Sequence, residues 1–135
     1  DQKTLRISDG LETFRDRQFS GSDIEKAIVP ASITVLGSGA FSACEQLHEI
    51  VFEFGSHLKI IESNCFMQSG LRRIAIPRTV QTIGDSAFRN CAELQEVTFE
   101  PGSRLKSIGE YCFWKSGVRK IVIPRSVSSI GKNTF

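Results

Sequence analysis

The sequence lacks the features that mark several large classes of protein. No apolar stretch approaches the roughly 18 residues of a membrane span, and the opening residues DQKTLR have no apolar core of a signal peptide. The 17 basic and 15 acidic side chains are interspersed, so no basic stripe for nucleic acid is present. No N-x-S/T glycosylation sequon occurs. We expect a soluble chain with no nucleic-acid partner and no direct insertion into a membrane.

Motifs of catalysis and metal binding are missing as well. The chain has no G-x-S-x-G elbow, no H-E-x-x-H pair and no P-loop, and no closely spaced Cys or His pairs that would hold zinc. Its four cysteines follow a repeating pattern instead of a disulfide framework, with Ala40 and Ala87 standing at the positions equivalent to Cys65 and Cys112. We predict free, buried cysteines that pack as small apolar side chains. We predict no enzyme activity, no cofactor and no metal site.

Phenylalanine recurs along the chain at alternating intervals of 22 and 25 residues, which define a 47-residue unit. Residues 41–70 placed on residues 88–117 give 15 identities in 30. A fixed period of this length is typical of a solenoid, in which each repeat buries its apolar face against its neighbours. The recurring residues are Phe19, Phe41, Phe66, Phe88, Phe113 and Phe135. The sequence therefore predicts one array, residues 1–135, of about six rungs.

Each rung opens with an L-x-x-I-x-I phrase, whose alternation predicts a half-buried strand. A second apolar pair, such as Val80 and Ile83, predicts an opposite wall, and the buried Phe fills a bend that we expect to be a short helical or 3-10 turn. Every second rung has two extra residues between strand and second wall, and should bulge there. The expected strands are 24–29, 47–52, 71–76, 94–99 and 118–123, with a sixth, truncated strand at Leu5.

The segment Leu71 to Cys91 reads L-x-x-I-x-I-P-x-x-V-x-x-I-G-x-x-A-F-x-x-C, which resembles the BspA-like class of leucine-rich repeats. Its alternation with F-E-x-G-S-x-L-K-x-I, at 52–61 and 99–108, resembles repeats of trichomonad surface proteins. The resemblance implies a leucine-rich-repeat solenoid, a right-handed coil with a parallel sheet on its concave face. It also implies a cell-surface or secreted recognition or adhesion module with a protein partner, such as a host or matrix protein, or a glycan.

Two sets of residues are candidates for binding. Charges of opposite sign alternate at the third strand position, and neighbouring rungs should bring them about 4.8 Å apart. A mostly β-branched, outward-facing stripe lies two positions further on, although strand propensity and register explain both features equally well. The candidate residues are Glu49, Val51, Arg73, Ala75, Glu96, Thr98, Lys120 and Val122. Tyr111 and Trp114 on one Phe turn are secondary candidates, with packing on the bend as the competing interpretation.

Compartment and extent stay open at this point. The absent sequons and unpaired thiols favour an alternative in which the chain is a cytoplasmic or structural scaffold that binds proteins through the same face. The array starts inside a strand and stops on Phe135 without distinct caps. We therefore expect either a segment of a longer array or a short array whose ends associate with another molecule, end-to-end self-association included.

Overall fold

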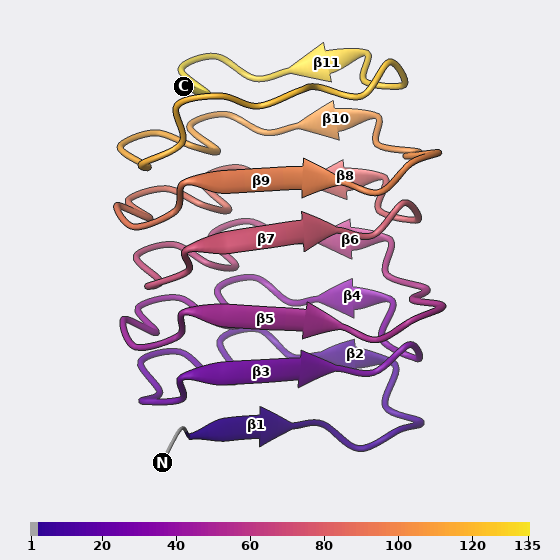
Figure 1. The fold of residues 1–135 in the computed structure, drawn as a ribbon, viewed down its shortest axis with the longest axis vertical. Helices are drawn as coiled ribbons and strands as arrows, with labels where there is room; N and C mark the ends of the chain where they lie inside the picture. Colours follow the sequence, from indigo (N-terminus) through magenta and orange to yellow (C-terminus); the bar gives the residue numbers. More distant parts are fainter. Residues whose placement is uncertain (1–2) are drawn as a thin grey trace.

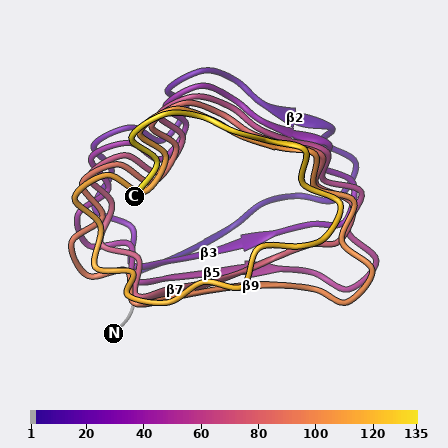
Figure 2. The same ribbon diagram turned by 90° about the horizontal axis from the view of Figure 1, so that it is seen from above.

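The rungs stack into a straight column with a strand on each of two opposite sides (Figures 1 and 2). This computed structural model describes residues 3–135. Every strand pair in it is parallel and joins one rung to the next. The predicted solenoid of stacked rungs with parallel strands is therefore confirmed.

One side of the column, which we call the strand face, carries the L-x-x-I-x-I phrases. In β7 the alternation of exposed Arg73 and Ala75 with buried Ile74 and Ile76 follows directly from the two-residue period of a strand. The strands of this face form two sheets, in the orders β1-β3-β5 and β7-β9. Their bounds are β1 Thr4–Arg6, β3 Lys26–Val29, β5 Glu49–Phe52, β7 Arg73–Ile76 and β9 Glu96–Phe99.

The opposite side is a continuous six-stranded sheet of two-residue strands, in the order β11-β10-β8-β6-β4-β2. The second apolar pairs supply its inward side chains, and Leu58, Ile61, Val80 and Ile83 are fully buried, as predicted. The bounds are β2 Thr13–Phe14, β4 Val35–Leu36, β6 Ile60–Ile61, β8 Thr82–Ile83, β10 Ser107–Ile108 and β11 Ser129–Ile130.

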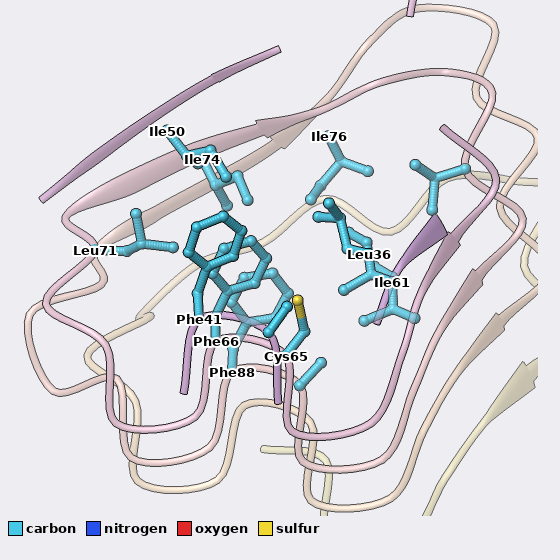
Figure 3. Packing of buried hydrophobic residues seen from close by; sticks show 14 of the residues in the cluster. Leu36, Phe41, Ile50, Ile61, Cys65, Phe66, Leu71, Ile74, Ile76 and Phe88 are labelled. Carbon is cyan, nitrogen blue, oxygen red and sulfur yellow. The ribbon is translucent and has the colours of Figure 1, made fainter. Parts of the chain in front are cut away.

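A column of phenylalanine rings runs along the interior at one end of the strands (Figure 3). Phe41, Phe66, Phe88 and Phe113 stack with ring centroids 5.3 to 5.4 Å apart and planes within 10° of parallel. Phe19 and Phe135 extend the stack at its two ends. Buried aromatic pairs at this separation stabilise a core beyond the area that they bury. The 22- and 25-residue spacing in the sequence therefore places successive Phe side chains in one interior column.

The Phe turns are not helical. Residues two before and two after the Phe have positive φ, for example Asn64 at 61° and Gln68 at 59° on either side of Phe66. The amides of these three residues donate to carbonyls of the next rung, at 2.8 to 3.0 Å. Because these amides bond between rungs, they cannot form the local i to i−4 bonds of a helix. The expected helical turn is replaced by two residues in the left-handed conformation, one on each side of the Phe. Asparagine and glycine, which adopt this conformation most readily, occupy several of these positions and were the signal in the sequence.

The last of the expected strands, 118–123, is not formed. No main-chain hydrogen bond joins residues 118–124 to β9 among the residues described, and Pro124 has no N–H to donate. The other expected strands are present, each beginning two residues later than its L-x-x-I-x-I phrase, and β1 is the truncated sixth. The second-wall partner of the same rung, β11, does pair with β10.

Candidate functional site

The eight residues of the candidate site all lie on the outer side of the strand face, exposed to solvent. Strand alternation places six of them outward, and Lys120 and Val122 are exposed in the segment that forms no strand. Val122 is 74% exposed and Val51 is 36% exposed, and both belong to the predicted apolar stripe. The structure thus brings the stripe and the charges onto one accessible surface.

The predicted ladder of alternating charges is divided into two pairs. Lys26 lies opposite Glu49 in the β3–β5 pair, with Lys26 Nζ 3.6 Å from a Glu49 carboxylate oxygen. Arg73 lies opposite Glu96 in the β7–β9 pair, but no ion pair within 4.0 Å joins them. Glu49 and Arg73 belong to different sheets, so the expected spacing between paired strands does not apply to them. Lys120, in the segment that forms no strand, has no ladder partner among the described residues.

A groove lies where the first sheet ends, between β5 and β7. Pro77 lacks the N–H with which Glu53 and Glu100 close the neighbouring strand pairs, at 2.9 and 3.1 Å, although Pro30 at the same position does not prevent β3 from pairing with β1. This first groove has a volume of about 280 Å³ and is lined mainly by apolar atoms. Its lining residues are Ile50, Val51, Phe52, Glu53, Phe54, Gly55, Ser56, Ala75, Pro77 and Glu100. Two of the candidate residues, Val51 on β5 and Ala75 on β7, therefore line the same groove.

Phe54 is the residue of this site that sequence reasoning missed. It lies in the two-residue extension after β5, and its side chain is fully exposed, at 103%. The extension itself was predicted to bulge, and an aromatic residue in a bulging corner was the signal. A fully exposed Phe beside an apolar groove is an unusual surface feature that marks a candidate contact for a partner.

A second groove repeats the first one 47 residues later, between β9 and residues 120–126. Nine of the ten residues that line the first groove have their counterpart 47 positions later in the lining of the second, Glu100 being the exception. The second groove is larger, about 760 Å³, and 118–123 has no main-chain hydrogen bonds to β9. Thr98 and Val122 occupy in it the places of Val51 and Ala75. The candidate stripe is thus the outer rim of two equivalent grooves.

Tyr111 and Trp114 lie together on one Phe turn, as predicted, although the turn is not helical. Their rings meet edge to face at 5.9 Å. The Arg89 guanidinium lies 4.7 Å from the Trp114 ring and 5.1 Å from the Tyr111 ring, and the Lys115 ammonium lies 4.5 Å from Trp114. Both aromatic side chains are half-buried. Each aromatic ring is therefore already contacted by a cation of the same chain, which supports the packing interpretation.

The cysteines are free and buried, as predicted. The thiols of Cys44 and Cys91 donate to the carbonyls of Phe19 and Phe66, at 3.1 and 3.0 Å. Burial raises the pKa of all four thiols, most strongly for Cys65 and Cys112. Within residues 3–135, no three His, Cys, Asp or Glu side chains lie close enough to hold a metal ion, and no helix is long and apolar enough to cross a membrane.

Comparison with known sequences decides the family. The model of the BspA type leucine rich repeat region matches six copies, over residues 2–59 and 59–135. The chain belongs to this family. Leucine-rich-repeat solenoids of this kind commonly serve as protein-interaction modules. Among curated proteins, none matches the chain.

Solved structures agree with the BspA-type assignment. The pneumococcal vaccine antigen PcpA matches all of this chain with a TM-score of 0.95 and 26% identity. A leucine-rich repeat protein from Bacteroides ovatus matches 98% of it with a TM-score of 0.86 and 28% identity. A leucine rich cell surface protein from Faecalibacterium prausnitzii, with 23% identity and a TM-score of 0.62, is similar in fold alone. The chain spans 38% of PcpA and 34% of the B. ovatus protein.

Proposed function

We propose that this chain is a protein-binding recognition or adhesion module of a cell-surface or secreted BspA-type protein, and that it binds through the strand face. The observation that carries the proposal is the exposed apolar rim around Val51, Ala75, Thr98 and Val122, repeated on two grooves. Exposed apolar surface next to charged side chains is typical of protein interaction sites.

The rigidity of the face supports the proposal. Outward side chains of β7 and β9 are fixed in register by a four-residue parallel pair, from Arg73 opposite Glu96 to Ile76 opposite Phe99. A surface that is ordered before binding loses less conformational entropy on association. The likeness to PcpA, a vaccine antigen, supports the surface location, since an antigen of a vaccine has to be reached by antibodies.

The alternative is a cytoplasmic or structural scaffold segment that binds proteins through the same face. The four free thiols favour it, because unpaired cysteines are more common in reducing compartments. Both functions place the partner on the strand face, so a test of the face serves both.

The test is a screen of the full chain against immobilised extracellular-matrix proteins, cell-surface proteins and glycans, followed by variants. We expect Val51→Ser, Val122→Ser and Arg73→Glu to weaken a bound partner, each by a factor of about five or more for a residue that contributes to the interface. Trp114→Ser, on the Phe turn, is the control and should bind normally. Loss of binding in Trp114→Ser with normal binding by the three strand-face variants would contradict the proposal.

A further inference from the structure

We propose that the two grooves together bind one amphipathic helix of a partner protein, which lies across the strands with apolar side chains seven residues apart. The proposal rests on the proposed function and names the kind of partner. It also assigns a role to Phe54 and to the two-residue extensions, which the leucine-rich-repeat core does not need.

The spacing of the grooves carries the proposal. Adjacent Phe rings of the interior column are 5.3 Å apart at Phe66–Phe88 and at Phe88–Phe113. Equivalent points 47 residues apart are two rungs from each other, which is about 9.6 Å at the usual spacing of about 4.8 Å between paired strands and at most 10.6 Å along the ring column. Two turns of an α-helix bring residue i+7 back to the same face about 10.5 Å further along its axis. A helix parallel to the column can therefore place residues i and i+7 in successive grooves.

An extended partner strand does not fit the same spacing. With a rise of about 3.3 Å per residue, three residues of a strand cover roughly 10 Å, but side chains i and i+3 point to opposite faces. The strand residues that share a face, i and i+2 or i and i+4, lie roughly 7 or 13 Å apart and miss one groove. The helix is thus the element whose period matches the solenoid.

The surface between the grooves allows a helix to approach. Ala75 and Thr98 stand side by side on the paired strands β7 and β9, and both are small. Larger side chains border the site at its rim, among them Phe54, whose exposed ring can cover the side of a bound helix. Apolar walls with small residues between them are how helix-binding grooves accept alternate turns of a partner.

Charge selects among helices. Glu53 and Glu100 line the first groove, and no basic side chain lines it. In the second groove Glu96 and Glu100 are accompanied by Lys120 and Arg125. A partner helix with Lys or Arg next to the apolar residue that enters the first groove would therefore be favoured. Rim charges of opposite sign accelerate association, and they disfavour binding of the helix in the reverse orientation. We infer a helix that is basic at the end bound in the first groove.

Two synthetic helical peptides test the proposal against the full chain. Both carry two Leu and flanking Lys on an Ala- and Gln-based helix, with the Leu seven positions apart in one peptide and five apart in the other. Fluorescence anisotropy of the labelled peptides should show binding of the seven-residue peptide that is at least about tenfold tighter, since only this peptide can bury both Leu side chains. Equal affinities, or no binding of either peptide, would show that the proposal is wrong.

Variants then locate the peptide. Ala75→Leu fills the first groove from an exposed position, and Phe54→Ser removes its exposed rim; each should reduce the affinity of the seven-residue peptide to that of the control peptide. Ala92→Leu makes the matched change at an exposed alanine outside both grooves and should leave binding unchanged. Unchanged binding by Ala75→Leu and Phe54→Ser also overturns the proposal. If a protein from the screen binds and Val122→Ser weakens that binding, while neither peptide binds, then the proposal of a helical partner is wrong and the proposed function of the strand face is retained.

Discussion

Phe66 and Phe88 stack with their ring centroids 5.3 Å apart and their planes 10° from parallel, although 22 residues separate them in the chain. Main-chain hydrogen bonds join the same rungs, since the amide of Phe66 donates to the carbonyl of Ala87 and the amide of Phe88 donates to the carbonyl of Cys112. Ring stacking and hydrogen bonding therefore have the same rung-to-rung period. Each rung is stabilised by both of its neighbours, as expected for a solenoid.

Phe88→Ala should cost about 3–5 kcal/mol of the free energy of unfolding, because the ring is fully buried between two others and its loss leaves a cavity. Urea denaturation followed by circular dichroism measures the change. Phe135→Ala is the control, since that ring is 62% exposed and stacks on one side only, and it should cost far less. Similar losses for the two variants would show that the stack does not dominate the stability of the core.

Ala43→Gly should raise the free energy of unfolding by roughly 1 kcal/mol. Ala43 has a φ of 57°, a left-handed conformation that strains any residue with a Cβ, and the equivalent Gly21 shows that the position accepts glycine. The control is Ala92→Gly, an exposed alanine without positive φ, which should be slightly destabilising because glycine gains entropy in the unfolded chain. The same sign for both variants would contradict the assigned backbone conformation.

The free energy of unfolding should fall as the pH rises above about 9. Burial raises the pKa of Cys65 and Cys112 above the ordinary value of 9.0, so the native thiols stay protonated while those of the unfolded chain ionise. The stabilisation is complete below pH 9 and is lost above it, which a series of denaturation curves from pH 7 to pH 10.5 would detect. Replacing both residues, Cys65→Ala with Cys112→Ala, introduces the residue found at the equivalent Ala40 and Ala87 and should weaken this dependence.

The same four thiols should react slowly in the native protein and quickly in denaturant, with a total of about four per chain, because thiolate formation requires exposure. A pair that becomes reactive only after reduction would indicate a disulfide and contradict the structure.

Lys26→Glu should destabilise the protein by about 1 kcal/mol, more than Arg73→Glu does. Both substitutions place two carboxylates opposite each other, but Lys26→Glu also removes a partly exposed ion pair with Glu49, whereas Arg73 has no ion pair with Glu96 to lose. Denaturation at low and at high salt measures both, and added salt should narrow the difference. A larger loss for Arg73→Glu would mean that the first groove does not separate the charges as described.

Much of the candidate site could be predicted from the sequence. Strand alternation alone placed Val51, Ala75, Thr98 and Val122 on the outside, and all are exposed. It could not place Phe54 beside a groove, because the path of an extended corner depends on its packing against neighbouring rungs. The grooves were missed for the same reason: every rung was expected to pair with the next, but β5 does not pair with β7, and residues 118–123 do not pair with β9.

The sequence by itself determined the period, the number of rungs, the inward residues and the family, because in a solenoid every rung repeats the same local contacts and a one-dimensional pattern contains them. Only the tertiary structure decided how adjacent rungs meet. The left-handed residues around each Phe exist because their amides bond to the next rung, and the strand face is divided between β5 and β7 although β3, which is followed by Pro30 in the same way, pairs with β1. These features depend on contacts between rungs, and the pattern within one rung does not specify them.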